Sequence, residues 1–194
     1  MIPSGQLTGA VLAGGESRRM GRDKAGLVVG ETPLWQRQVD LLRAAGASVV
    51  GVVRRPGQAM LHLPADVPLW QDAVSGIGPL AGLHVALTSC RTPWLAVVAT
   101  DLPRLEAGWF RWLGGLCSPG RGAMARLTDG PFEPLAAIYP KAALAEVTRR
   151  LSGPEYSLQS LATALVAQQL MDTATVPEAD RGQLENWNTP AEAG

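Results

Sequence analysis

The residues with the clearest chemical potential lie in one glycine-rich loop near the N-terminus. The loop runs from Leu12 to Lys24 and reads Leu-Ala-Gly-Gly-Glu-Ser-Arg-Arg-Met-Gly-Arg-Asp-Lys. Its glycines let a ligand approach the main chain, where successive N–H groups can converge on an anion. The loop contains four cationic residues, Arg18, Arg19, Arg22 and Lys24, together with two acidic residues. This composition predicts a phosphate site, although a solvated basic loop is the alternative.

Two aspartates later in the chain are candidates for a metal ligand and a base-reading group. Asp101 directly follows the apolar run 94–100, and its hard carboxylate oxygens suit Mg2+. Asp72 precedes a stretch rich in glycine and proline, and its carboxylate can accept both N1–H and N2–H of guanine. The alternatives are a helix cap or turn former at Asp101 and an Asx-turn or cap at Asp72.

Two amides near the C-terminus form a third candidate group. Asn186 and Asn188 occupy alternate positions, so in an extended segment both side chains point the same way. They could then face one ligand or a metal-bound water. The alternative is that Asn188, followed by Thr189 and Pro190, caps a terminal helix.

Predicted strands bring the glycine loop and Asp101 to one edge of a sheet. Short apolar runs indicate strands at 9–12, 49–53 and 94–100. A helix that begins at Thr32-Pro33 and ends at Gly46 links the first two strands as a right-handed βαβ unit. Ligands bind beyond the carboxyl ends of such strands, where Arg54-Arg55 would lie near the glycine loop. Those arginines would help hold a phosphate or form a solvated basic turn.

The second half of the chain is interpreted as further strands and covering helices. Helices are expected at 80–90, 109–116, 141–151 and 158–168, and strands at 123–127 and 134–139. The sequence contains no internal repeat, low-complexity tract or flexible linker. We therefore expect one domain over residues 1–194.

Bulk composition argues against several classes of protein. The chain has 194 residues, and its 17 basic and 17 acidic residues cancel, so no global field favours nucleic acid or a membrane. The longest apolar run is too short to span a bilayer and the N-terminus lacks a secretory signal, so we expect a cytoplasmic protein. Cys90 and Cys117 lack zinc-site spacing and are expected to be buried free thiols.

The loop string resembles the signature of the nucleotidyltransferases related to molybdenum cofactor guanylyltransferase. Weaker segments of that family follow in order, at Gly78 to Leu83, Asp101 to Pro103, Pro134 to Tyr139 and Asn186 to Pro190. The resemblance covers nearly the whole chain. It implies a single-domain, three-layer α/β/α fold with a Rossmann-like, mostly parallel sheet of the nucleotide-diphospho-sugar transferase type. It also implies a nucleotide-binding half at about 1–103 and an acceptor-binding half at about 104–194.

The resemblance further implies transfer of GMP from Mg·GTP to the terminal phosphate of molybdenum-bearing molybdopterin, with release of pyrophosphate. It assigns nucleotide binding to Leu12, Ala13, Gly14, Gly15, Lys24, Asp72, Gly78 and Asp101. It assigns catalysis to Lys24, Asp101 and Arg19. It assigns binding of Mg2+ to Asp101 and binding of the acceptor to Asn186 and Asn188. Molybdoenzyme maturation proteins are further partners that the family allows.

One departure and two rival functions remain open. Many relatives carry an asparagine at or just after the second strand, where this chain has Val52, Val53, Arg54 and Arg55. Nucleotide choice therefore depends mainly on Asp72, and cytidylyl or other nucleotidyl transfer to molybdopterin or a sugar phosphate is one rival. The other is a nucleotide-binding adaptor without catalysis that delivers cofactor to a molybdoenzyme. The presence of both Lys24 and Asp101 argues against the adaptor.

Overall fold

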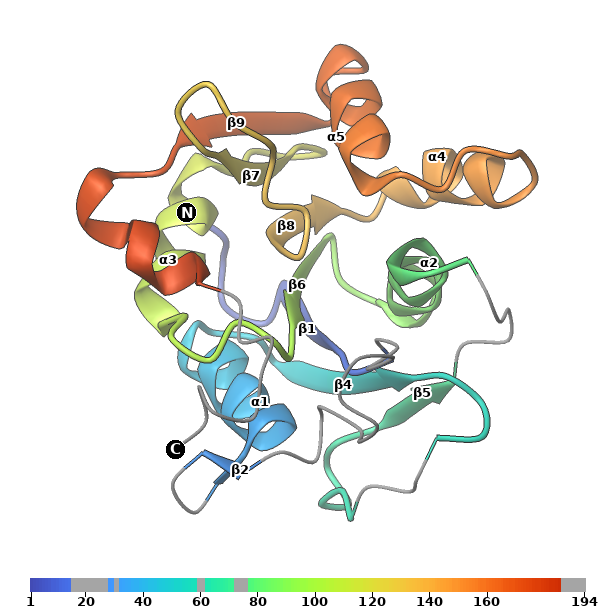
Figure 1. Ribbon diagram of the computed structural model, residues 1–194, viewed down its shortest axis with the longest axis vertical. Coiled ribbons are helices and arrows are strands. Elements are labelled where there is room, and N and C mark those ends of the chain that lie inside the picture. Colours follow the sequence, from blue (N-terminus) through green and yellow to red (C-terminus); the bar gives the residue numbers. More distant parts are fainter. Residues whose placement is uncertain (15–27, 30–31, 59–61, 72–76, 186–194) are drawn as a thin grey trace.

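A seven-stranded sheet with the strand order β5-β4-β1-β6-β8-β7-β9 forms the centre of the computed structural model (Figure 1). The structure describes residues 1–14, 28–29, 32–58, 62–71 and 77–185. The strands are β1 (Leu7–Leu12), β4 (Val49–Arg54), β5 (Leu69–Gln71), β6 (Trp94–Ala99), β7 (Gly122–Arg126), β8 (Ala136–Pro140) and β9 (Met171–Thr175). Strand β8 is antiparallel to both β6 and β7, and the remaining neighbours pair in parallel. A separate hairpin joins β2 (Val28–Val29) to β3 (Thr32–Pro33).

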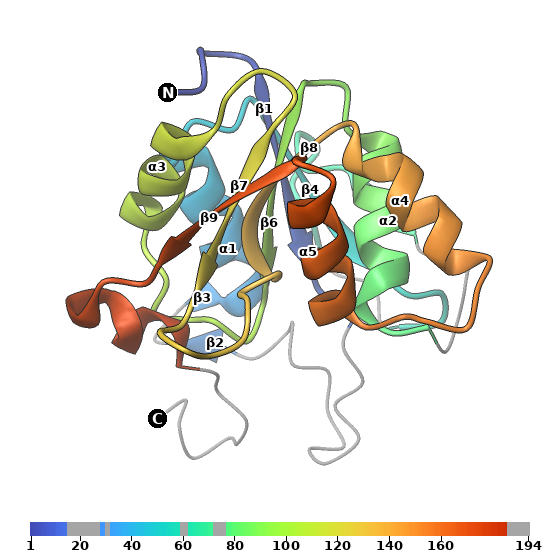
Figure 2. The same cartoon turned by 90° about the horizontal axis from the view of Figure 1, so that it is seen from above.

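Helices cover both faces of this sheet. One face carries α1 (Leu34–Ala44) and α3 (Ala107–Leu116), and the other carries α2 (Pro79–Ser89), α4 (Ala143–Leu151) and α5 (Leu158–Ala167) (Figure 2). A 3-10 helix, η2 (Glu178–Leu184), follows β9. The predicted three-layer α/β/α fold with a mostly parallel sheet is thus confirmed.

The alternation of side chains along each central strand divides the interior into two cores. In β1, Val11 packs with α1 and α3, whereas Ala10 and Leu12 pack with α2 on the opposite face. In β6, Val98 and Leu95 divide in the same way. Both faces are apolar because both are covered, as is usual for parallel sheets.

Most predicted elements are present, with one wrong helix start. We expected Thr32 as the cap and Pro33 as the first helical residue, but Pro33 itself is the N-cap of α1 and both residues pair in β3. The hairpin pairing keeps Thr32 in a strand, so its hydroxyl makes no cap bond. The helix ends as predicted before Gly46, whose φ of 101° is a left-handed conformation suited to glycine.

The cysteines match the bulk expectation only in part. Both cysteines are free; Cys90 is buried, whereas Cys117 is half-buried rather than fully buried as predicted. Burial raises the pKa of the Cys117 thiol to about 12, which disfavours the thiolate. No helix within the described ranges has the length and apolar character needed to cross a membrane.

Candidate active site

Three neighbouring strands end at the same level of the sheet. Leu12, the last residue of β1, is in register with Val53 of β4 on one side and Ala99 of β6 on the other. The chain passes from β1 through α1 to β4 and reaches β6 only later, on the opposite side of β1 (Figure 1). Such a reversal of strand order opens a crevice at the carboxyl edge, where ligands of α/β sheets bind.

The glycine loop begins in this crevice. The side chains of Leu12 and Ala13 are buried in the two cores, so the main chain is the part of the loop start that can meet a ligand. The N–H of Ala13, however, donates to the carbonyl of Val53 at 2.9 Å. The strand ladder therefore extends one residue beyond the predicted strand end, and this N–H is already used. The N–H of Ala13 is therefore not open to a phosphate, and nucleotide binding by other main-chain groups of Ala13 and Gly14 stays a prediction.

Arg54 and Arg55 lie beside the loop start, as predicted from the end of the second strand. A Cβ atom added to Gly14 would lie 3.3 Å from Cγ of Arg55, so the arginine stem packs directly on this glycine. Arg54 is only 3% exposed and pairs with Gln71 of β5. The main-chain N–H of Arg55 donates to Oε1 of Gln58 at 2.9 Å. Two cationic residues therefore border the crevice next to the glycine loop.

The N-terminus of α2 lies at the same edge. A Cβ atom added to Gly82, in its first turn, would lie 3.6 Å from side-chain atoms of both Leu12 and Val53. Gly78 is the N-cap, exposed, with φ 76° and ψ −153°, a conformation nearly restricted to glycine. The N–H groups and the positive dipole end of a helix favour anions there. This end of α2 adds to the electropositive main chain at the crevice.

Asp101 occupies the turn after β6 on the other side of β1. Asp101 is half-buried and lies between two buried residues, Thr100 and Leu102. Within the described ranges, no group of three or more His, Cys, Asp or Glu side chains could hold a metal by itself. Protein-bound Mg2+ often uses one or two carboxylates together with substrate phosphates and water, so a single carboxylate here fits that ion.

The beginning of β8 forms the next part of the edge, because this strand runs opposite to β6. The N–H of Ala99 donates to the carbonyl of Leu135 at 3.0 Å, and the Tyr139 hydroxyl donates to the carbonyl of Pro134 at 2.8 Å. Glu133 precedes them, and burial raises the pKa of its carboxyl group above the ordinary 4.5. Glu133 lies just before the Pro-Leu-x-Ala-x-Tyr segment and was not among the predicted site residues.

The last described residues contact the turn region that contains Asp101. The N–H of Glu106 donates to Oε1 of Gln183 at 3.1 Å, and Arg104 forms an ion pair with Glu185. Leu184 packs against the core that contains α1 and α3. These contacts fix the chain immediately before Asn186 beside the turn that follows β6.

Several predicted site residues lie outside the described residues. They are Gly15, Arg19, Lys24, Asp72, Asn186 and Asn188. Their assigned roles stay predictions. Among the described candidates, the structure brings Leu12, Ala13, Gly14 and Asp101 to one edge of the sheet and places Gly78 at the start of the helix packed on it.

A family comparison agrees with this architecture. The model of the MobA-like NTP transferase domain matches residues 9–173, which include every described candidate. This chain belongs to the MobA-like NTP transferase family. A relative from Opitutus terrae named "Probable molybdenum cofactor guanylyltransferase" is 49% identical over 187 residues. The matched residues cover 95% of this chain and 91% of the relative.

Solved structures share the fold of this MobA-like protein at low sequence identity. Molybdopterin-guanine dinucleotide biosynthesis protein A from Archaeoglobus fulgidus superposes with a TM-score of 0.72 at 20% identity, covering 96% of this chain and 94% of that one. Rv0371c from Mycobacterium tuberculosis, in complex with manganese, superposes with a TM-score of 0.60 at 18% identity, covering 90% and 89%. Both structures share the fold of this chain.

Proposed function

We propose that this protein transfers GMP from GTP to the terminal phosphate of molybdopterin, forming the guanine dinucleotide cofactor and pyrophosphate. The observation that carries the proposal is the pairing of Leu12 with Ala99, which starts the glycine loop and the Asp101 turn at adjacent strand ends. A phosphate-binding main chain and a carboxylate thereby share one crevice. The name of the Opitutus terrae relative supports the same nucleotide and acceptor.

The reaction needs positioning and charge neutralisation more than proton transfer. A phosphate oxygen of molybdopterin attacks the α-phosphorus of GTP, the bond from that phosphorus to the bridging oxygen breaks, and pyrophosphate leaves with the electron pair. The attacking phosphate is already ionised at neutral pH, so no general base is required. Neither His62 nor His84 falls in a family motif, which agrees with that chemistry.

The chain's own groups divide the work along the crevice. Main-chain amides from Gly14 onward and the N-terminus of α2 at Gly78 hold phosphate oxygens. Lys24 and Arg19 neutralise charge that develops on the α-phosphate and on the leaving pyrophosphate. Asp101 would hold Mg2+, which when bound neutralises phosphate oxygens. Manganese in the Rv0371c structure is the precedent for a divalent cation on this fold.

We further propose separate roles for the two halves of the chain. Residues 1–103 bind the nucleotide, with Asp72 accepting N1–H and N2–H of guanine. Residues 104–194 bind the acceptor through Asn186 and Asn188. The ion pair of Arg104 with Glu185 supports the second assignment, because it holds the residue before Asn186 next to the turn that follows Asp101.

The deciding experiment measures pyrophosphate release and dinucleotide formation with purified molybdenum-bearing molybdopterin and each nucleoside triphosphate. Among the triphosphates, only GTP is expected to yield both pyrophosphate and the dinucleotide. Preferential use of CTP would change the substrate assignment, whereas GTP binding without either product would favour the adaptor function. Titration of Mg2+ with Asp101→Asn adds a separate test, since a neutral amide is a poorer ligand for a hard dication. An unchanged rate and metal requirement would place the metal ligand elsewhere.

A competition experiment tests how guanine is read. Inosine triphosphate keeps N1–H but lacks the exocyclic N2 amine. With the parent protein, we expect GTP to be preferred by about ten- to a hundredfold, the scale of one charge-assisted hydrogen bond. Asp72→Asn is expected to reduce that preference while leaving the binding of the triphosphate tail largely unchanged. Equal use of both triphosphates by the parent would exclude a contact between Asp72 and N2.

A further inference from the structure

Helix α1 contains a fully buried glutamine. Gln38 is 0% exposed and lies between apolar side chains of the helix that include Trp35, Val39 and Leu42. Glutamine is seldom fully buried, because its amide must then find hydrogen-bond partners inside the protein. Its position in the core thus needs a reason beyond packing.

The amide of Gln38 reaches the turn that contains Asp101. Its Nε2 donates to the carbonyl of Leu102 at 2.7 Å, across 64 positions of sequence. The same carbonyl accepts the N–H of Leu105 at 3.3 Å. Gln38 thus bonds to the main-chain carbonyl of Leu102, the residue that follows the proposed metal ligand.

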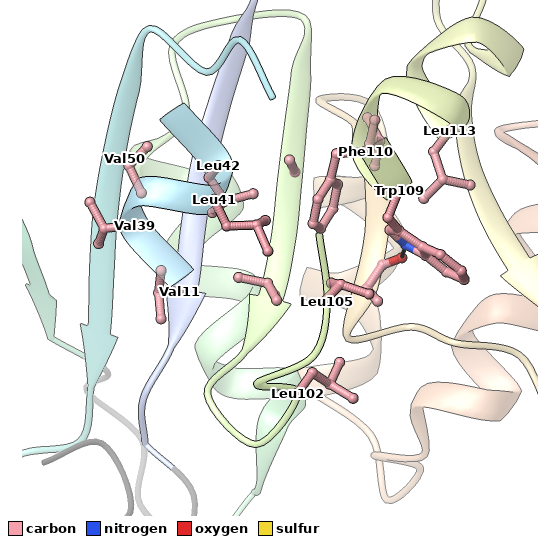
Figure 3. Packing of buried hydrophobic residues seen from close by; sticks show 14 of the residues in the cluster. Val11, Val39, Leu41, Leu42, Val50, Leu102, Leu105, Trp109, Phe110 and Leu113 are labelled. Atoms are coloured by element: carbon pink, nitrogen blue, oxygen red, sulfur yellow. Dashed lines mark hydrogen bonds between the residues drawn. The ribbon is translucent and has the colours of Figure 1, made fainter. Parts of the chain in front are cut away.

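This turn has no strand ladder of its own. Residues 100–106 lie between β6 and α3, and the turn is held by apolar anchors together with the bond from Gln38. Leu102 and Leu105 belong to the same apolar layer as Leu42 of α1 and Phe110 of α3 (Figure 3). The leucine side chains fix the depth of the turn, whereas a hydrogen bond to a carbonyl also fixes the orientation of the peptide.

Stability alone does not account for this amide. Oε1 of Gln38 is buried and makes no hydrogen bond with the residues that the structure describes. A buried acceptor without a partner is destabilising, which offsets most of the stability that the Nε2 bond contributes. An apolar side chain of similar volume would avoid that cost. What an apolar residue could not replace is the hydrogen bond to the carbonyl of Leu102.

We propose that Gln38 is a positioning residue that sets the orientation of the Asp101 carboxylate for the divalent cation. The inference rests on the proposed function, because it takes Asp101 as the metal ligand. Groups that orient a metal ligand typically change metal affinity or activity by about 10–100-fold when they are removed. Gln38 contacts the turn rather than the reacting atoms, so its effect passes through Asp101.

The test measures metal binding directly, with the free Mn2+ signal in electron paramagnetic resonance as the readout. The protein is saturated with GTP, and no molybdopterin is added, so turnover does not contribute. Gln38→Met keeps the side-chain length and removes the N–H donor. We expect it to weaken Mn2+ binding about tenfold and to raise the half-saturating Mg2+ concentration of the reaction by a similar factor. Gln38→Asn keeps an amide but shortens it by one methylene, and it is expected to act in the same direction.

Ser48→Ala is the matched control. The Ser48 hydroxyl donates to the carbonyl of Leu7 at 3.1 Å, which is also a side-chain bond to a main-chain carbonyl, but at the opposite end of β1. This variant should leave Mn2+ binding unchanged. A similar weakening in Ser48→Ala would mean that general destabilisation causes the effect, and the inference would be overturned.

Asp101→Asn, measured in parallel, separates failure of this inference from failure of the proposed function. Loss of Mn2+ affinity in Asp101→Asn but in neither Gln38 variant leaves the metal assignment intact and overturns the role of Gln38. Unchanged affinity in Asp101→Asn removes the assigned ligand, and the inference with it. If neither Gln38 variant folds, the residue is structural, which also overturns the inference.

Discussion

Replacing Gly78 with alanine tests whether a strained main chain shapes the nucleotide site. Gly78 is the N-cap of α2, with φ 76° and ψ −153°. A Cβ atom there would meet no atom of the described residues within 4 Å. Any effect of Gly78→Ala therefore comes from backbone conformation rather than from a steric clash. Alanine in this region of φ and ψ costs about 1–3 kcal/mol.

Gly115 gives a control with the opposite sign. It is an exposed residue of α3, and a Cβ atom there also meets nothing within 4 Å, but its φ does not lie in the left-handed region. Alanine loses less backbone entropy than glycine in a helix, so Gly115→Ala should stabilise the protein by about 0.5–1 kcal/mol. The two substitutions add the same methyl group into open space, so the difference between them isolates the cost of the conformation at Gly78.

Thermal unfolding and steady-state kinetics measure the two consequences. For a chain of this size, 1 kcal/mol corresponds to about 2–4 °C in Tm. If alanine keeps the glycine conformation, Gly78→Ala should lower Tm. If the start of α2 moves to relieve the strain, Tm should stay unchanged and KM for GTP should rise. Gly115→Ala should raise Tm and leave KM unchanged. Equal, small effects on Tm and KM in both variants would refute the reasoning, because the left-handed conformation would then neither be required nor serve the nucleotide site.

Three further perturbations test charges in and around the fold. Lys24→Ala should leave Tm unchanged and lower kcat by roughly a hundredfold, about 3 kcal/mol of transition-state stabilisation; normal turnover would exclude Lys24 from the mechanism. Hydrogen bonds from Arg149, and then from Gln168 and Arg150, lower the pKa of Glu146 from 4.5 to about 2 despite its burial. The stabilisation from this carboxylate is therefore complete above pH 4.5 and lost as the pH falls to 2, so chemical denaturation across that range should show a steeper loss for the parent than for Glu146→Gln. Lys141→Met should lower the free energy of unfolding by about 1.5 kcal/mol without changing KM for GTP, because Lys141 donates to the carbonyls of Leu87 and Cys90 at the C-terminus of α2, the end away from the crevice.

The central strands were predictable because their chemistry is local. Trp94–Ala99 is a continuous apolar run buried along its whole length, and Val49–Arg54 is apolar up to Val53 and buried from Val50 onward; such runs have few alternatives. By contrast, β5 and β9 were missed. Leu69–Gln71 has three half-buried or exposed residues and becomes a strand through its pairing with β4. Met171–Thr175 contains polar residues and becomes a strand by pairing with β7. Neither pairing is visible in a local pattern.

The placement of Gly14 and Asp101 at one edge of the sheet was predictable, because a motif follows a strand end at each; their roles stay predictions. Gln38 was not predictable, because a glutamine in an amphipathic helix indicates an exposed position. Its burial depends on the carbonyl of Leu102, which the fold brings to it from a distant part of the chain. The hydrogen bond that occupies the N–H of Ala13 likewise depends on the exact register of β1 with β4.

The reversed strand β8 has a consequence for how such transferases can diversify. It joins β6 through five successive pairs, from Trp94 with Pro140 to Val98 with Ala136, and the residues at the centre of this seam include Ala96 and Ala137. In three of these pairs, Ala96 with Ile138, Val97 with Ala137 and Val98 with Ala136, one partner is an alanine, and such pairs tolerate a new partner strand better than pairs of two large side chains. The seam also coincides with the boundary between the proposed nucleotide and acceptor halves. If the chain beyond α3 binds the acceptor, as proposed, its exchange between relatives would change the acceptor and leave the crevice at the ends of β1 and β6 unchanged.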